Sequence, residues 1–280
     1  MKKRVSIFCI IVFLSGLGIL LYPFISNLLN QRNATQVIKD YDKEIQNMDK
    51  KEIDVIKEAA KKYNEQLSNA VAVDEDSKND AISYVDISGE NKVIGYIVIP
   101  KIDVNLPIYS GTSESVLRKG VGHMPQTSYP LGGESTHCVL TGHRGLPSAV
   151  LFTDLNKLEM GDEFYLHVMD ETLAYRVEQI KVVEPNESED LNIVQGADFC
   201  TLVTCTPYSI NTHRLLVRGT RTEYAGANEK GTNNQLQSGS FAKRIVDVWP
   251  WLLIAFVVVG LGETILFVLM IRRKRKDKEE

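Results

Sequence analysis

Cysteine is scarce in this 280-residue chain, and its four thiols form no C-x-x-C pair of the kind that holds zinc. Cys9 lies inside a long apolar run, which leaves Cys138, Cys200 and Cys205 in the middle of the chain. Three thiols cannot form a closed disulfide framework, so at least one of them is free. The sequence also has no internal repeat. These absences exclude a disulfide-stapled miniprotein and a repeat protein, and we expect no cofactor.

Positive charge is scarce between the two ends of the chain. Nine of the 32 lysine and arginine residues lie in residues 2–4 and 272–278. Residues 5–244 then contain eight more acidic than basic side chains. Nucleic acid needs a basic surface, so a nucleic-acid-binding function is excluded. The acidic surplus suits a calcium site or a solvated surface equally well, and we therefore predict no metal.

Two long apolar runs indicate membrane segments. The first, Val5–Leu21, has 17 residues, which at ~1.5 Å per residue reach about 26 Å and approach the thickness of a bilayer core. Lys2–Arg4 precede it, as in a signal peptide, but no A-x-A-type cleavage site follows. We therefore predict an uncleaved anchor, and either interpretation exports the residues that follow.

The second apolar run, Trp249–Ile271, has tryptophans at its outer end and the basic sequence RRKRK directly after it. These two features mark the ends of a membrane helix. Glu263 interrupts the run, and we expect this acid to be neutral, snorkelling or paired with a partner helix. Since basic flanks stay in the cytoplasm, we predict a cell-membrane protein with two transmembrane helices and residues 30–244 on the outer face.

Between the membrane segments the sequence pattern changes twice. Apolar residues recur at helical spacing through residues 32–70, and Asp49 followed by Glu52 is typical of a helix start. The next stretch is acidic and aperiodic, as in a loop or lid. The predicted segments are an anchor or signal segment (1–29), amphipathic helices (30–70), a lid-like loop (71–91), a β-domain (92–222), a polar linker (223–247), a transmembrane helix (248–271) and a basic cytoplasmic tail (272–280).

The predicted β-domain contains short runs rich in β-branched residues, separated by turns that glycine and proline mark. This pattern, with few helical stretches, predicts a mostly β fold built as a closed or nearly closed barrel. The predicted strands are Val93–Pro100, Glu163–Val168, Thr172–Val183, Phe199–Cys205 and His213–Thr220.

Three side chains near strand ends form a candidate catalytic group. Cys205 ends an apolar strand where TPYSIN must turn the chain, and Arg214 on the returning strand can meet it across the hairpin. His143 lies in the glycine-flanked turn of VLTGHRG. Thiol attack on an amide needs a thiolate, an acid for the departing amine and a cation for the oxyanion. Cys205, His143 and Arg214 can supply these three groups.

Other cysteine, histidine and arginine residues have simpler explanations. Cys138 and Cys200 lie within apolar strands and are predicted to be packed thiols. Strand alternation turns His213 away from the candidate arginine, although it stays an alternative base, as Arg218 and Arg221 stay alternative arginines. The remaining histidines are expected to line the pocket, cap turns or lie on the surface: His123, His137 and His167.

Around the candidate group the sequence resembles the sortase family, membrane-anchored cysteine transpeptidases of Gram-positive bacteria with an eight-stranded barrel. The resemblance rests on TLVTC with a downstream arginine and an upstream TGH, and it covers about residues 93–221. The segments IPKIDVNLPIYSG, KGVGHMPQTS, TGHRGLPSAVLFTDL and TCTPYSINTHRLLVRG are similar to the class C, pilin-polymerising branch.

The resemblance implies a role for each candidate: Cys205 as nucleophile, His143 as general acid/base, and Arg214 as the arginine that stabilises the oxyanion or orients the substrate. It implies cleavage of an LPXTG-type sorting signal between Thr and Gly, a thioester, and transfer to an amine. In class C this amine is typically a pilin lysine, and otherwise it belongs to cell-wall precursor. The implied partners are LPXTG-bearing pilins or surface proteins and the lipid bilayer, with the barrel facing the cell wall.

The acidic loop departs from the class C pattern. Lids of that branch often carry an Asp-Pro-aromatic motif, whereas this loop has Asp74, Glu75 and Asp76 with no proline or aromatic ring directly after them. Asp74 and Asp76 are therefore candidates for a lid that lacks a ring anchor. Two alternatives stay open: a wall-anchoring sortase of another class, and a catalytically silent receptor or scaffold on the same barrel.

Overall fold

The computed structural model describes residues 2–72, 89, 91–225 and 262. The chain divides into two compact units, Tyr22–Thr232 and residues 1–21 with 233–280. The predicted lid residues Asp74 and Asp76 lie outside the described residues, and so does all of the predicted helix 248–271 except Gly262. The candidate site belongs to the unit Tyr22–Thr232.

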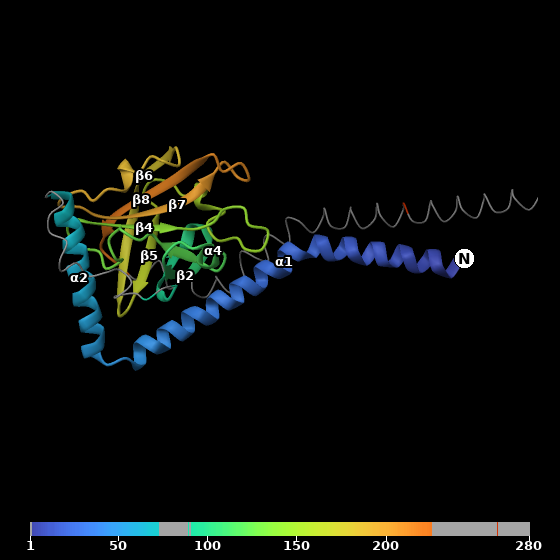
Figure 1. The fold of residues 1–280 in the computed structure, drawn as a ribbon, viewed down its shortest axis with the longest axis horizontal. Coiled ribbons are helices and arrows are strands. Elements are labelled where there is room, and N and C mark those ends of the chain that lie inside the picture. Colours follow the sequence, from blue (N-terminus) through green and yellow to red (C-terminus); the bar gives the residue numbers. More distant parts are fainter. Residues whose placement is uncertain (1, 73–88, 90, 226–261, 263–280) are drawn as a thin grey trace, which may run out of the picture. The chain divides into compact units, whose positions relative to one another are not determined.

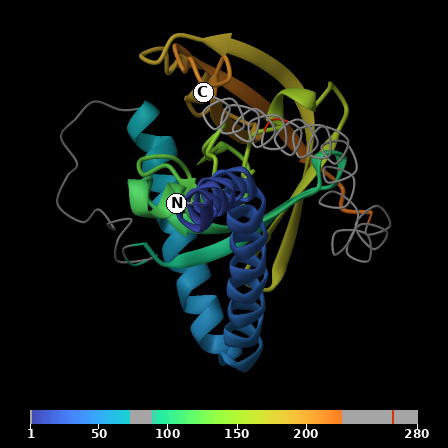
Figure 2. The same ribbon diagram turned by 90° about the vertical axis from the view of Figure 1, so that its right-hand side faces the viewer.

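Among the described residues, two helices precede the barrel, α1 (Lys2–Asn47) and α2 (Lys50–Ala72). α1 runs without a break from the predicted membrane segment into the first amphipathic stretch, with Pro23 inside it. The predicted start of α2 is confirmed, because the Asp49 carboxylate accepts a hydrogen bond from the Lys51 N–H at 3.3 Å and caps the helix. Figure 2 shows the two helices meeting at this turn.

The first half of α1 exposes large apolar side chains. Ile10, Ile11, Val12, Leu14 and Ile19 each expose more than half of their surface. Within the described part of the chain, α1 is the helix long and apolar enough to cross a membrane, over Ile10–Asn47, by length and composition. Water-exposed helices seldom carry so continuous an apolar surface, which agrees with the predicted anchor.

In the described residues, eight strands close into a barrel in the order β1-β2-β3-β4-β7-β8-β6-β5 (Figure 1). The strands are β1 (Val93–Ile99), β2 (Val104–Ser110), β3 (Val121–His123), β4 (Thr136–Thr141), β5 (Glu163–Val168), β6 (Glu171–Val183), β7 (Asp198–Thr206) and β8 (His213–Thr222). A short helix, α4 (Glu114–Leu117), connects β2 with β3. The predicted barrel is confirmed, and the five predicted strands end within two residues of the observed ones.

Two pairs of neighbouring strands are parallel, β2 with β3 and β4 with β7, whereas the other described neighbours are antiparallel. The β5–β6 hairpin turns at Met169 and Asp170, close to the predicted turn, and Met169 adopts a φ of 54° there. Parallel strands bring their carboxyl ends to one edge of a sheet. The β4–β7 pair therefore defines an edge of the barrel where two chain segments emerge together.

Aliphatic and aromatic side chains from all eight strands fill the barrel. The largest of those that are almost fully buried include Ile97, Ile99, Ile108, Leu140, Phe164, Leu166, Tyr175 and Leu202. Ala34 of α1 and both Ala60 and Tyr63 of α2 join the same cluster. Burial of apolar surface at roughly 25 cal/mol per Å² is the main favourable term here, so one core holds the strands and both helices together.

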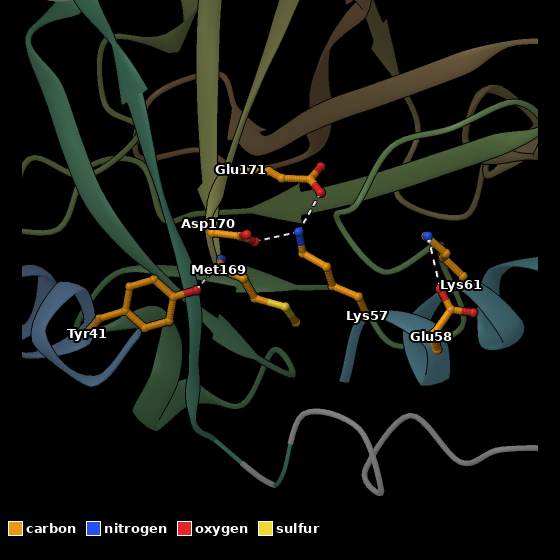
Figure 3. A network of polar contacts seen from close by, with 7 residues as sticks. All are labelled: Tyr41, Lys57, Glu58, Lys61, Met169, Asp170 and Glu171. Atoms are coloured by element: carbon orange, nitrogen blue, oxygen red, sulfur yellow. Dashed lines mark hydrogen bonds and ion pairs between the residues drawn. The ribbon is translucent and has the colours of Figure 1, made fainter. Parts of the chain in front are cut away.

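A tyrosine hydroxyl fixes α1 against the barrel, and Figure 3 shows its contact with Met169. Tyr41 is buried, and its hydroxyl donates to the Ile94 carbonyl of β1 at 3.1 Å. The same oxygen accepts the Met169 N–H, at the β5–β6 turn, at 2.7 Å. Both the donor and the acceptor capacity of the buried hydroxyl are therefore satisfied by backbone groups of the barrel.

An ionic contact fixes α2 to the same turn (Figure 3). The Lys57 ammonium lies 2.5 Å from Glu171 Oε1 and also contacts Asp170. Burial opposes the charge on Lys57, but hydrogen bonds with both carboxylates outweigh it and raise the pKa of the lysine. The hydrogen bond from Lys57 in turn lowers the pKa of Asp170. Because that pKa is lowered, the contribution of Asp170 to stability is present above the usual aspartate range and is lost on acidification.

Replacing the lysine should lower both the stability of the fold at neutral pH and its sensitivity to acid. We expect Lys57→Met to lower the free energy of unfolding by about 1 kcal/mol or less, because the carboxylate of Asp170 is half exposed. The thermal midpoint of the variant should fall less than that of wild type between about pH 5 and 3, since Asp170 no longer has a lowered pKa. Thermal unfolding of the full chain in detergent measures both effects.

Lys61→Met is the matched control for this measurement. Lys61 lies on the same helix and pairs with Glu58 of α2 at 3.1 Å (Figure 3). Its replacement should leave the acid sensitivity of the thermal midpoint as it is in wild type. Equal acid sensitivity in Lys57→Met and wild type would contradict the assignment of this contact.

Candidate active site

The parallel strands β4 and β7 carry two of the predicted site residues out of the barrel at the same edge. Thr141, the last residue of β4, pairs with Val203 of β7. The pairing continues one residue further, where the Gly142 N–H donates to the Val203 carbonyl at 3.1 Å. His143 and Cys205 each lie two residues beyond the Thr141–Val203 pair. The register therefore brings these two residues to the same level on neighbouring strand ends.

Cys205 lies between the ends of β4 and β8. Its thiol is free and half-buried, at the point where the buried run of β7 ends. The preceding residue, Thr204, is buried and donates its hydroxyl hydrogen to the Gly142 carbonyl at 2.7 Å, which fixes β7 to the β4 side. On the other side Cys205 is the register partner of Arg214. The predicted meeting of cysteine and arginine across the hairpin is confirmed.

The guanidinium of Arg214 is held by its own turn. Its Nη1 donates to the carbonyls of Asn211 at 3.3 Å and His213 at 3.1 Å. Within the described residues no carboxylate forms an ion pair with this guanidinium, and its two hydrogen bonds go to carbonyls of its own turn. The same turn presents Tyr208 and Ile210, which are 53% and 67% exposed. A cation and two apolar side chains therefore lie on the hairpin that starts at the thiol.

The imidazole of His143 has an acidic neighbour that the sequence did not indicate. Its Nε2 lies 3.3 Å from Oε2 of Glu114, the first residue of α4. The other carboxylate oxygen of Glu114 accepts a hydrogen bond from Arg118 Nε at 2.8 Å. The hydrogen bond from Arg118, together with His143, lowers the pKa of Glu114 and keeps the carboxylate ionised. The carboxylate can therefore accept a hydrogen bond from the imidazole and orient the ring.

A second residue missing from the predicted site, Arg144, links the histidine turn to β7. Its Nη1 donates to the Thr206 hydroxyl at 3.1 Å, beside the cysteine. Its Nε donates to the Thr153 carbonyl at 3.2 Å and its Nη2 to Asn156 Oδ1 at 2.9 Å. The three nitrogens thus bind three different groups and fix the turn after β4. The sequence feature that could have indicated a role for Arg144 is its position directly after the histidine in a glycine-flanked turn.

Cys138 and Cys200 of the barrel are packed thiols, as predicted. Cys138 and Cys200 are buried register partners on β4 and β7. Burial raises the pKa of Cys200 well above its usual value, so that this thiol stays protonated. A buried, protonated thiol is a poor nucleophile.

The remaining histidines and arginines have structural contacts of their own. His123 and His137 are fully buried and bind the Ser128 and Asn192 carbonyls, so neither lies on the surface of the site. His167 is stacked on Tyr96 with ring centroids 4.3 Å apart, which corrects the expectation of a plain surface residue.

The alternative base and arginines lie elsewhere on β8. His213 is exposed and lies beside Thr212, whose hydroxyl is 2.9 Å from its Nδ1. Arg218 pairs with Glu178 at 2.7 Å and covers the Phe199 ring. The third alternative, Arg221, lies over the Tyr175 ring, 5.7 Å from its centroid. Of the three arginines on β8, Arg214 is therefore the one whose backbone is the register partner of Cys205.

Three neighbouring strand ends thus present a thiol, an imidazole and a guanidinium to one edge of the barrel. A thiol can attack a carbonyl carbon, an imidazolium can protonate a leaving amine, and a guanidinium can stabilise an oxyanion. Among the residues that the structure describes, no group of three or more histidine, cysteine or acidic side chains is placed to hold a metal ion.

Comparisons with known proteins agree with this site. The family model for the sortase domain matches residues 97–222. Sortase D of Bacillus subtilis is 33% identical over 151 residues, which cover 54% of this chain and 71% of that protein. Sortase A of Streptococcus agalactiae is 33% identical over 128 residues, which cover 45% of this chain and 51% of that protein.

Solved structures of class C sortases are similar over about two thirds of the chain. Sortase C of Clostridium perfringens, solved with the C-terminal cell wall sorting motif, is 48% identical with a TM-score of 0.62, and the match covers 68% of this chain and all of that one. Sortase C-1 of Streptococcus pneumoniae is 49% identical with a TM-score of 0.61, over 68% of this chain and all of that one. These two solved structures are class C sortases, and the chain belongs to the sortase family of cysteine transpeptidases.

Proposed function

We propose that this protein is a membrane-anchored, pilin-polymerising sortase that acts through Cys205, His143 and Arg214. It cleaves an LPXTG-type sorting signal between Thr and Gly and transfers the threonyl acyl group to a lysine amine of a pilin. The observation that supports this most directly is the position of Cys205, which is the register partner of Arg214 on one side and lies level with His143 on the other.

In the acylation step, the thiolate of Cys205 attacks the carbonyl carbon of the signal's threonine. The oxyanion that forms is stabilised by Arg214, whose guanidinium has no described acidic partner. The His143 imidazolium gives its proton to the departing glycine amine, and the C–N bond breaks. The products are a thioester on Cys205, a released glycine peptide and a neutral imidazole.

In the transfer step, a neutral amine attacks the thioester carbonyl. His143 accepts the proton that the amine loses, an amide forms and the Cys205 thiolate leaves. The thiolate and imidazolium are thereby restored. The carboxylate of Glu114 lies 3.3 Å from Nε2 and can hold the imidazole in position for the next acylation.

The hairpin between the cysteine and the arginine suits the apolar start of a sorting signal. Tyr208 and Ile210 are largely exposed there, and they can contact the leucine and proline of an LPXTG-type peptide. Among the structural matches, Sortase C1 of group B Streptococcus Pilus Island 1 is 44% identical over 69% of this chain. This likeness favours a pilin lysine over cell-wall precursor as the acceptor.

Membrane anchoring places this chemistry at the cell surface. We infer that α1 crosses the membrane with Lys2–Arg4 in the cytoplasm, so that Tyr22–Thr232 lies outside and faces the cell wall. Pilins and surface proteins with sorting signals are exported to the same side and are the proposed partners.

The first step can be tested by the mass of the intact protein. The full chain in detergent, mixed with an LPXTG-type peptide, should gain the mass of the acyl fragment that ends in threonine. Cys205→Ala should gain no mass, because it lacks the sulfur atom that forms the thioester. Cys200→Ala is the matched control, since it removes a buried cysteine of the same strand and should leave the adduct in place. Turnover by Cys205→Ala would overturn the mechanism, and an inactive wild type would favour a silent scaffold.

The acceptor can be tested on the preformed adduct. Chasing it with a lysine-containing pilin domain should consume the adduct at least about tenfold faster than triglycine, a mimic of wall precursor, at equal amine concentration. Mass spectrometry of the product should show an amide on one lysine side chain. Faster transfer to triglycine would instead support a wall-anchoring sortase.

Arg144 should matter for turnover because it fixes the turn that presents the histidine. We expect Arg144→Lys to lower kcat by about tenfold to a hundredfold, since lysine cannot satisfy three separate acceptors and a displacement of 1 Å can cost about a hundredfold. Steady-state kinetics on the peptide measure this. Arg176→Lys is a control that alters an arginine bound to Glu163 on another strand pair and should leave kcat unchanged.

A further inference from the structure

Two asparagines of α1 contact the segments that lie on either side of His143. Asn27, which is 9% exposed, accepts a hydrogen bond from the Val150 N–H through Oδ1 at 3.0 Å. Val150 belongs to the turn that begins with the histidine, and in that turn the Phe152 N–H donates to the His143 carbonyl at 3.1 Å. A short path of hydrogen bonds therefore joins α1 to the backbone of His143.

A second path joins α1 to the imidazole ring. Asn30 donates from Nδ2 to the Arg118 carbonyl at 3.3 Å, at the end of α4. The Arg118 side chain binds Glu114 at the start of α4, and the Glu114 carboxylate lies against His143 Nε2. The two paths thus reach the same histidine from its backbone and from its ring.

The two asparagines act from one face of the helix. Residues three apart are neighbours on a helix surface, so the amides of Asn27 and Asn30 are directed to the same side of α1. Leaving a buried amide without a partner costs free energy, so the contact of Asn27 with a backbone N–H holds the Val150 turn in place.

His143 needs such support because it lies beyond the strand. The last backbone pairing on its side is that of Gly142 with Val203. After that residue the turn is held by Arg144 on the β7 side and by Asn27 on the α1 side. A general acid must lie within about 3 Å of the atom that it protonates, so small displacements of this turn affect the rate.

We propose that Asn27 and Asn30 are positioning residues for His143, acting through the Val150 turn and α4. The helix that is proposed to anchor the protein then also supports its active site. Asn27 lies six residues after the end of the apolar segment Val5–Leu21. This inference rests on the proposed function, because it requires His143 to be the acid and base of the reaction.

The chain offers a matched control in a third asparagine. Asn64 of α2 is also buried, and its amide binds both the N–H and the carbonyl of Tyr129, at 2.6 and 3.0 Å. Tyr129 precedes β4, so Asn64 supports the end of β4 opposite to His143. Asn64→Ala therefore removes a helix–barrel contact of the same chemistry without acting on the histidine turn.

The experiment compares Asn27→Ala and Asn64→Ala in the full chain, in detergent, with a fluorogenic LPXTG-type peptide and a fixed amine. We expect Asn27→Ala to lower kcat about tenfold with KM within twofold of wild type, while Asn64→Ala keeps both. Thermal midpoints should fall in both variants. Equal kcat in Asn27→Ala and wild type, or an equal loss of kcat in Asn64→Ala, would overturn the proposal.

Substitution by aspartate distinguishes the contact of Asn27, which accepts a hydrogen bond, from that of Asn30, which donates one. Asn27 uses its oxygen as an acceptor, so Asn27→Asp should keep kcat within about threefold of wild type. Asn30 uses its amide as a donor, so Asn30→Asp should lose activity as Asn30→Ala does. If Asn27→Asp is as slow as Asn27→Ala, or Asn30→Asp is as fast as wild type, positioning through these hydrogen bonds is wrong.

His143→Ala, measured in parallel, shows which claim has failed. If His143→Ala turns over like wild type, the proposed function is wrong. If His143→Ala is inactive while Asn27→Ala keeps full kcat, the mechanism stands and only the role of α1 is wrong.

Discussion

Six register pairs hold β4 parallel to β7, from Thr136–Asp198 to Thr141–Val203. The arrangement of the site depends on this pairing, because it brings the carboxyl ends of two strands that are distant in the sequence to one edge of the barrel. A slip by one residue would turn every side chain of one strand to the opposite face and separate His143 from Cys205. The buried side chains Leu140 and Leu202, which are register partners, oppose such a slip from inside the core.

The strands fix where the site lies, and the contacts beyond the strand ends fix its geometry. Arg144 links the histidine turn to β7, Glu114 places a negative charge against the imidazole, and Asn27 holds the outer side of the same turn. Each of these contacts crosses between segments that are far apart in the chain. The charge pattern is consistent with the chemistry, since a carboxylate lies beside the imidazole and Arg214 is the register partner of the cysteine.

Sequence patterns predicted the local parts of this arrangement. The β7–β8 hairpin follows from two apolar runs and a turn, so the meeting of Cys205 with Arg214 could be inferred from alternation alone. The barrel followed from short strands and turn residues, and Asp49 marked the start of α2 by a capping signal.

The non-local parts could not be predicted in the same way. Nothing periodic in the sequence indicates that β4 pairs with β7, because β5 and β6 lie between them in the chain. The proximity of His143 to Cys205 was therefore expected from chemistry and family resemblance. Glu114 and Asn27 were missed because isolated polar residues in a short helix and in an apolar helix have no spacing rule that points to a distant histidine.

Single-turnover acylation tests the central claim most directly. Full-length wild type, His143→Ala and Arg214→Ala would be mixed rapidly with excess LPXTG-type peptide, quenched in acid, and the acylated fraction read from intact mass. If the three strand ends act together, wild type acylates in one phase, and both variants acylate at least about a hundredfold more slowly. Acylation of His143→Ala or Arg214→Ala at the wild-type rate would contradict the account.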